Sequence, residues 1–203
     1  MSGSYFITGI GTGIGKTIAS AVLTEKLNAD YWKPIQAGDL EQSDSLMVES
    51  LLSNSISKIH AEKYKLNHPL SPHLAAKLDG LTIDLNAFEL PETENNLIVE
   101  GAGGLMVPLN DEYLILDLIK RINLHVILIS KHYLGSINHT LLTINTLKQH
   151  QIPIKGIIFN GEPNEESEKY ILNYGKVANL GRVPTFAELN KDAIIEAGKG
   201  LSL

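Results

Sequence analysis

The stretch GIGTGIGKT at residues 9–17 decides the fold. It follows residues 4–8, a short apolar segment bounded by glycines, which this pattern predicts to be a buried strand. It runs directly into residues 17–28, where apolar side chains recur at helical spacing. A strand, a glycine-rich turn and a helix in this order direct backbone N–H groups and the positive end of a helix dipole at one point. That arrangement favours a bound phosphate group.

Two side chains of this stretch have the chemistry of a phosphate loop. Lys16 can neutralise phosphate oxygens, and the hydroxyl of Thr17 can bind a magnesium ion. The generic motif has four residues between its first glycine and Gly-Lys-Thr, whereas five follow Gly9 here, so the match is a variant. The alternative is a glycine-rich turn beside a surface lysine. The coincidence of strand, glycines, Lys-Thr and helix favours the phosphate loop.

Strand-like and helix-like segments alternate along the rest of the chain. Short apolar runs predict strands at residues 30–33, 97–99, 124–129, 154–159 and 177–180. Helical spacing predicts helices at residues 43–52, 113–122, 137–150, 165–174 and 187–197, while 53–83 is ambiguous apart from a weak helical signal over 73–78. Apolar strands alternating with helices are typical of a parallel sheet that is covered on both faces. We therefore expect an α/β fold, a single P-loop NTPase domain spanning residues 1–203 with a mainly parallel sheet.

Composition excludes several classes of protein. The 203 residues are 43% hydrophobic and 20% charged, which is typical of a globular domain, and the net charge of −6 disfavours nucleic acid and anionic membranes as partners. The absence of cysteine excludes disulfides, thiolate metal sites and cysteine nucleophiles. No apolar run approaches the roughly 20 residues of a membrane span, and the N-terminus lacks a signal-peptide pattern. We expect a cytoplasmic protein.

Charged side chains follow two of the other predicted strands. Lys33 ends the second strand, Asp44 starts the helix after it, and Glu100 follows the strand at 97–99. Because ligands of open α/β sheets bind at the carboxyl ends of the strands, we expect these residues and Lys16 to share one site. Each has a plainer alternative: a strand-end charge for Lys33, a helix-start charge for Asp44, and a flexible turn for the glycine-rich residues 101–104. Glu100 stands where P-loop proteins more often have Asp.

The sequence resembles the dethiobiotin synthetase family through segments that run through most of the chain in the family order. The segments are YFITGIGTGIGKT at 5–17, WKPIQAG at 32–38, SDSL at 43–46, SPHLAA at 71–76, VEGAGGLMVPL at 99–109, LGSINHT at 134–140, FNG at 159–161 and GRVPTF at 181–186. The long spacing from Gly9 to Gly15 is also similar to this family.

The resemblance implies an enzyme of biotin biosynthesis, a cyclo-ligase that forms C–N bonds. Its substrates would be 7,8-diaminononanoate, CO2 and ATP, and its products dethiobiotin, ADP and phosphate. The reaction would pass through a carbamate and a carbamic-phosphoric mixed anhydride. The resemblance further implies Mg2+ as cofactor, ATP as co-substrate, and a homodimer.

It also implies roles for individual residues. The expected catalytic residues are Lys33, Lys16 and Thr12, and the expected magnesium ligands are Thr17, Asp44 and Glu100. The expected nucleotide-binding residues are Gly13, Ile14, Gly15, Lys16, Thr17, Ile18, Asp44, Glu100, Gly101, Ala102, Gly103, Asn160, Gly161, Pro184, Thr185 and Phe186. The expected substrate-binding residues are Thr12, Lys33, Ala37, Gly135, Ser136, Ile137 and Asn138, the last four reaching the substrate carboxylate across a dimer interface. Ala37 departs from the family, which often has a hydroxyl there.

Two other functions compete with this interpretation. A P-loop ATPase switch of the partitioning type would hydrolyse ATP without the diamine, and many such proteins have a lysine early in the loop, near the position of Gly11, where this chain has none. A small-metabolite kinase would leave its phosphate on the product.

Overall fold

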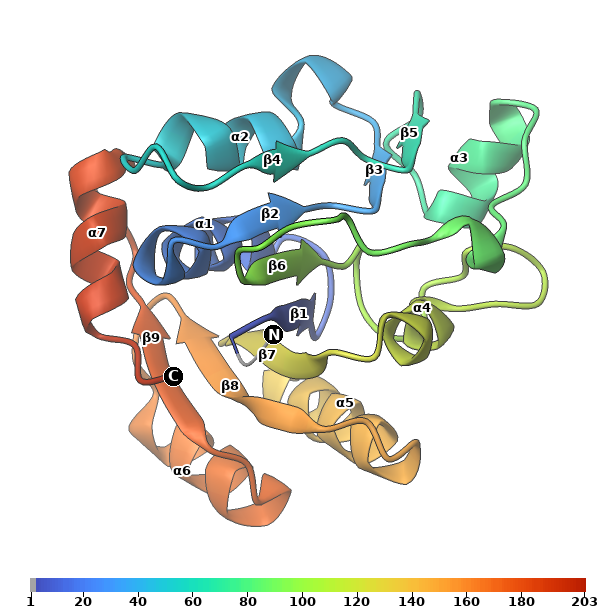
Figure 1. Cartoon of the computed structure of the whole chain (residues 1–203). Coiled ribbons are helices and arrows are strands. Elements are labelled where there is room, and N and C mark those ends of the chain that lie inside the picture. The colour runs from blue at the N-terminus through green and yellow to red at the C-terminus, as the bar shows by residue number, and fades with distance from the viewer. Residues whose placement is uncertain (1–2) are drawn as a thin grey trace.

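The computed structural model describes residues 3–203, and the chain folds around one seven-stranded sheet (Figure 1). Its strand order is β4-β2-β6-β1-β7-β8-β9, and every neighbouring pair is parallel. The strands are β1 (Tyr5–Gly9), β2 (Asp30–Trp32), β4 (Ile59–His60), β6 (Leu97–Glu100), β7 (His125–Lys131), β8 (Ile154–Asn160) and β9 (Asn179–Val183). A parallel sheet in this α/β arrangement confirms the predicted fold class.

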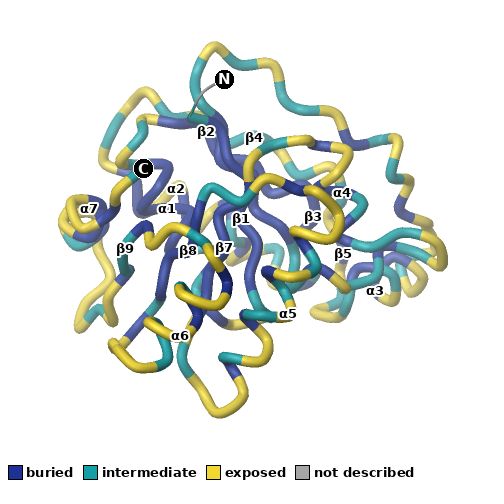
Figure 2. The backbone as a smooth tube through the Cα atoms, turned by 90° about the horizontal axis from the view of Figure 1, so that it is seen from below, coloured by how far each residue is buried: buried dark blue, intermediate teal, exposed yellow. Residues whose placement is uncertain are grey.

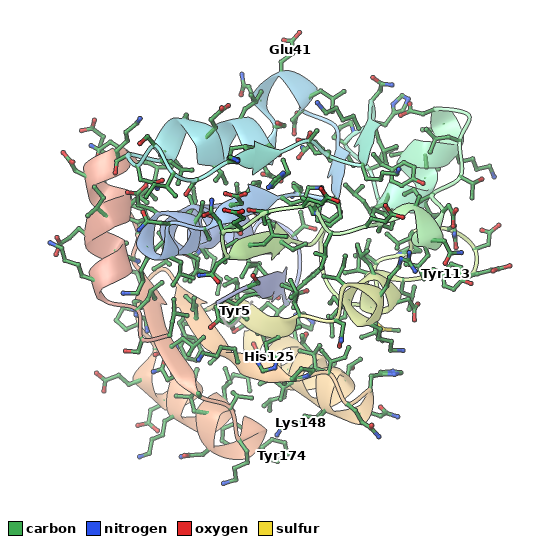
Figure 3. The ribbon with its side chains drawn as sticks, in the orientation of Figure 1. Tyr5, Glu41, Tyr113, His125, Lys148 and Tyr174 are labelled. Atoms are coloured by element: carbon green, nitrogen blue, oxygen red, sulfur yellow. The ribbon has the colours of Figure 1, made fainter. Side chains whose placement is uncertain are left out.

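Helices cover both faces of the sheet because alternate strand residues point to opposite sides. Ile7 packs with α1 (Lys16–Leu27), α2 (Asp44–Leu51) and α7 (Lys191–Lys199), and its neighbour Phe6 packs with the opposite cluster. That second face is covered by α3 (Pro72–Leu78), α4 (Ile115–Ile122), α5 (Ser136–Gln149) and α6 (Glu165–Gly175). Figure 2 shows the strands as the buried interior, with exposed residues concentrated on helices and loops. Between the two helices α5 and α6, Lys148 Nζ donates a hydrogen bond to the carbonyl of Gly175 at 2.6 Å (Figure 3).

The structure differs from the sequence prediction mainly in short elements and helix starts. Residues 53–83, left ambiguous above, contain β4 and β5 (Tyr64–Leu66), and β5 forms a small parallel sheet with β3 (Ile35–Ala37). The prediction of a helix from residue 187 is wrong, because α7 begins at Lys191 after Asn190, whose side chain accepts the Ala193 N–H and caps the helix. Likewise α4 begins at residue 115 rather than 113, and β9 spans 179–183 rather than 177–180.

The start of β2 is fixed by the buried carboxylate of Asp30. Its Oδ1 accepts the Lys58 N–H and the Asn95 amide, each at 2.9 Å, and its Oδ2 accepts the Thr93 hydroxyl at 2.7 Å and lies 2.8 Å from His60 Nε2. Burial by itself would raise the pKa of Asp30, but these hydrogen bonds lower it below its usual value. The ionised carboxylate therefore ties β2 to β4 and to the segment before β6, which fixes where β2 starts.

No helix within residues 3–203 combines the length and the apolar character that crossing a membrane requires.

Candidate active site

The loop between β1 and α1 is held from both sides. The side chain of Ile14 is buried in the core below the loop, and Asn160, at the end of β8, donates from Nδ2 to the Ile14 carbonyl at 2.8 Å. Gly15 has a left-handed φ of 92°, and a Cβ added there would lie 2.1 Å from Asn160 Nδ2. Lys16 bends back over the loop and donates from Nζ to the Gly11 carbonyl at 2.9 Å. The loop is thus a fixed cradle rather than a free glycine-rich turn.

The glycines after β6 pack directly against this loop. A Cβ on Gly104 would lie 3.3 Å from the Gly9 carbonyl oxygen, and one on Gly103 would lie 3.6 Å from Thr12 Oγ1. A Cβ on Gly101 would lie 2.8 Å from the ring of Phe6. Gly104 is therefore explained by the close approach of two backbones, Gly101 by the Phe6 ring packed against it, and Gly103 by its positive φ of 65°. They bring residues 101–104 beside the phosphate loop and leave Thr12 exposed at its outer side.

Four side chains from separate parts of the chain meet at the carboxyl edge of β2 and β6. The Thr17 hydroxyl lies 2.8 Å from Asp44 Oδ1 and 3.0 Å from Glu100 Oε1. Lys33 Nζ forms ion pairs with Asp44 Oδ2 and, at 3.1 Å, with Glu100 Oε1. Each side chain is placed by its element: Thr17 by the first turn of α1, Asp44 by the start of α2, and Lys33 and Glu100 by adjacent parallel strands. The structure brings together four of the predicted site residues.

Burial and charge act against each other in this cluster. Burial lowers the pKa of Lys16 from its usual value, and nearby Glu100 offsets only part of that effect. Burial would also lower the pKa of Lys33, but Glu100 and Asp44 outweigh it and raise that pKa. Burial would raise the pKa of Asp44, but Lys33 outweighs it and lowers that pKa. Lys33 and Asp44 are therefore both charged at neutral pH, although the lysine is almost fully buried.

Sequence reasoning missed two residues that hold the cluster. The Tyr31 hydroxyl donates to Glu100 Oε2 at 2.9 Å, and burial together with the charge of Glu100 raises the pKa of Tyr31 well above its usual value, so the hydroxyl stays a donor. Gln36 Oε1 accepts the Asp44 N–H at 3.3 Å. The signal for Tyr31 was present, because residues 31 and 33 point to the same side of a strand and a buried tyrosine hydroxyl needs a partner.

The oxygens of Thr17, Asp44 and Glu100 fit a magnesium ion. Mg2+ prefers hard oxygen ligands and is usually bound through one or two carboxylates together with substrate phosphates. Within residues 3–203, no group of three or more His, Asp or Glu side chains lies close enough to hold a metal. Two carboxylates and one hydroxyl lie together beside the loop between β1 and α1, and they are oxygen donors of the kind that Mg2+ prefers.

The other predicted site residues form separate groups. Asn160 touches the phosphate loop, and Thr185 Oγ1 lies 3.7 Å from where a Gly161 Cβ would be, which links those two segments. Ala37 is half-buried in β3. The group at residues 135–138 forms the start of α5, and no hydrogen bond in the described part of the chain joins it to the phosphate loop. The remaining predicted residues are Gly13 and Pro184, which are exposed, and Ile18 and Phe186, which pack on the core.

We expect Gly15→Ala to lower ADP affinity by on the order of 100-fold, because the new Cβ would collide with Asn160 and strain the left-handed backbone. Gly80→Ala is the matched control, since Gly80 has a similar positive φ of 73° but no neighbour within 4 Å of an added Cβ. Calorimetric ADP titrations of both variants check this. Equal affinity in the two variants would contradict the description of the loop as a tightly held cradle.

Comparison with known proteins identifies the family. The chain matches the family AAA_26, described as an AAA domain, over residues 3–193. It is 54% identical over 192 residues to the ATP-dependent dethiobiotin synthetase BioD of Christiangramia forsetii, covering 93% of this chain and 92% of that protein. The protein of the same name from Cytophaga hutchinsonii is 51% identical, with 94% and 92% covered. Among solved structures, the cell division ATPase MinD of Pyrococcus furiosus has a TM-score of 0.58 at 13% identity, with 98% of each chain covered, which shows a shared fold. The chain belongs to the dethiobiotin synthetase family.

Proposed function

We propose that this protein uses ATP to convert 7,8-diaminononanoate and CO2 into dethiobiotin, ADP and phosphate, a step of biotin biosynthesis. Relatives that are 43–54% identical over most of the chain carry the name dethiobiotin synthetase. The structural observation that carries the proposal is the ion cluster of Lys33 with Asp44 and Glu100 beside the phosphate loop. The partitioning-type ATPases share the fold, but at only 11–14% identity.

The proposed reaction has three steps. One amine nitrogen of the substrate attacks CO2 and loses a proton, which gives a carbamate. A carbamate oxygen then attacks the γ-phosphorus of ATP and releases ADP, which gives a mixed anhydride. The second amine attacks the carbamate carbon, a proton leaves, and the C–O bond to phosphate breaks. The products are a cyclic urea and inorganic phosphate.

The main obstacle to phosphoryl transfer here is electrostatic. Carbamate and triphosphate are both anions, and in a site of low dielectric their repulsion amounts to several kcal/mol. Lys16 lies at the phosphate loop, and Lys33 lies at the end of β2 on the same edge of the sheet. In our proposal Lys16 neutralises the nucleotide and Lys33 neutralises the carbamate, so that the two anions approach each other. Phosphoryl transfer is catalysed mainly by such positioning and charge stabilisation.

The residues proposed to hold magnesium are Thr17, Asp44 and Glu100. The Thr17 hydroxyl already lies 2.8 Å from Asp44 Oδ1 and 3.0 Å from Glu100 Oε1. When bound there, Mg2+ would neutralise charge on the β- and γ-phosphates. In the structure Lys33 pairs with both carboxylates of this set, and the charges of Lys16, Lys33, Asp44 and Glu100 sum to zero. In our proposal the positive and negative side chains of this site balance each other. Binding the anionic triphosphate and carbamate there therefore requires the additional positive charge of Mg2+.

The segments away from the cluster complete the proposed site. Asn160 with Gly161 and the stretch 184–186 would surround the adenine, since Asn160 already contacts the phosphate loop. Thr12, exposed beside Gly103, would face the diamine or carbamate. Ala37 offers no hydroxyl to the substrate, so neighbouring groups must satisfy the substrate's polar atoms there. We also propose that residues 1–203 act as one domain, supported by the seven-stranded sheet, whose strands are drawn from residues 5 to 183.

The product decides between this function and its competitors. We expect ADP formation to require 7,8-diaminononanoate and bicarbonate, and mass spectrometry to detect dethiobiotin and free phosphate. Equal ATP turnover without the diamine would favour the ATPase switch, and a phosphorylated diamine would favour a kinase. Either of these results would overturn the proposed function.

We expect Lys33→Ala to lower the rate of dethiobiotin formation by roughly 10²–10³-fold, because one preorganised charge-stabilising group is lost. Lys120→Ala is the control, since Lys120 is exposed on α4 and pairs only with Asp117 on the same helix. Steady-state rates at saturating ATP and diamine measure the effect. A near-normal rate in Lys33→Ala would remove Lys33 from the mechanism.

We propose a homodimer in which the start of α5 of one copy faces the substrate of the other. Leu134, two residues before the helix, is fully exposed, and Leu142 is 57% exposed one turn after Asn138 on the same side of the helix. These apolar side chains flank residues 135–138, which make no hydrogen bond to the phosphate loop of their own chain. A partner chain would both cover the leucines and receive this helix start.

We expect Leu134→Asp to convert the dimer to monomer and to raise the KM for the diamine, while ADP affinity stays unchanged. The physical reason is that a charge in an apolar interface loses hydration without a partner. Leu189→Asp, at a leucine that is 40% exposed before α7, is the control. Sedimentation velocity measures the oligomeric state. A dimer that survives Leu134→Asp unchanged would contradict this interface.

A further inference from the structure

The two oxygens of the Glu100 carboxylate have different partners. Oε1 lies 3.0 Å from the Thr17 hydroxyl and 3.1 Å from Lys33 Nζ. Oε2 accepts the hydroxyl of Tyr31 at 2.9 Å. Tyr31 is 0% exposed and Glu100 is 1% exposed, so water does not compete for this hydrogen bond.

The sheet explains why a tyrosine makes this contact. β2 and β6 are neighbouring parallel strands, and Tyr31 stands opposite Ile98 in their register. Glu100 lies two residues beyond Ile98, roughly 6.6 Å further along the strand and on the same face. A tyrosine ring spans that distance and puts its hydroxyl at the carboxylate. Lys33, two residues after Tyr31, points to the same face and reaches Glu100 from the other side.

We infer that Tyr31 is a positioning residue for the proposed magnesium–nucleotide site, because its hydroxyl holds Glu100 Oε2 and leaves only Oε1 for Thr17 and the cation. The inference rests on the proposed role of Glu100 as a metal ligand. Without the hydroxyl, the buried carboxylate has an unpaired oxygen that Lys33 can also bind. The lysine would then hold both oxygens and compete with Mg2+ for them. Groups that hydrogen-bond to a metal ligand in this way typically change metal affinity by about 10–100-fold.

Tyr31→Phe tests the inference, since it removes one oxygen and keeps the ring that packs in the core. Tyr64→Phe is the matched control: the Tyr64 hydroxyl accepts the Asp84 N–H at 3.0 Å on β5, away from the ion cluster. ADP affinity is measured by calorimetry with excess EDTA and over a Mg2+ titration. We expect Tyr31→Phe to raise, by about tenfold or more, the Mg2+ concentration at which the change in ADP affinity is half-maximal. We expect it to change the ADP affinity measured without Mg2+ by less than about twofold. We expect no change in Tyr64→Phe.

A double-mutant cycle with Glu100→Gln separates positioning from general damage to the fold. Gln keeps the shape of Glu100 but carries no charge, so a hydroxyl that acts through the carboxylate has little left to position. The Mg2+ dependence of Glu100→Gln and of Tyr31→Phe/Glu100→Gln should therefore be the same. In Glu100→Gln and in the double variant Lys33 keeps its ion pair with Asp44, so neither variant leaves the buried lysine without a partner.

Four results would overturn the inference, three from the variants and one from the unmodified protein. Those from the variants are an unchanged Mg2+ dependence in Tyr31→Phe, an equal loss of ADP affinity with and without Mg2+, and a further loss in the double variant beyond Glu100→Gln. An ADP affinity of the unmodified protein that does not respond to Mg2+ would also overturn it. None of these measurements uses the diamine, so they are independent of the product assay that decides the proposed function.

Discussion

The ion pairs that Lys33 makes with Asp44 and Glu100 are the interaction on which the site depends. A buried lysine or carboxylate is stable only when it is paired and hydrogen-bonded, and removing one partner leaves a charge without compensation. Here the partners come from the end of β2, the end of β6 and the start of α2, so the pairing requires all three elements in place. The charged site therefore exists only where all three elements are in their folded positions.

The parallel sheet makes that pairing geometrically available. All strands of the main sheet run in the same direction, so β1, β2 and β6 end at one edge and their following residues lie near one another. The phosphate loop follows β1, and the glycines after β6 allow its backbone to come within van der Waals contact of that loop. Asp30 and Tyr31 are neighbours in β2 with different roles. The Tyr31 hydroxyl contacts Glu100 in the site, whereas the Asp30 carboxylate fixes the start of the strand.

The same fold serves proteins with other names, as the similarity to MinD of Pyrococcus furiosus shows. A fold supplies a nucleotide-binding edge, while function depends on the side chains at that edge. In this chain the side chains at that edge include the lysine that follows β2 and contacts the carboxylates proposed as metal ligands. In our proposal that lysine allows a carbamate to bind next to the anionic nucleotide. A second chain contributes the start of its α5 to the substrate site.

The sequence by itself determined the long-range plan. Apolar strands, helical spacing and the loop at residues 9–17 predicted the α/β class, the parallel sheet and the edge that carries Lys16, Lys33, Asp44 and Glu100. The period of apolar residues is a local property of the chain, and alternating strands and helices favour a parallel sheet. Only the tertiary structure decided the short strands within 53–83, the start of α7, and the contact of Tyr31 with Glu100. Strands of two or three residues have no period of their own, and a hydrogen bond between residues 69 apart depends on the register of two strands. That register arises from packing of the whole sheet, which no single stretch of sequence encodes.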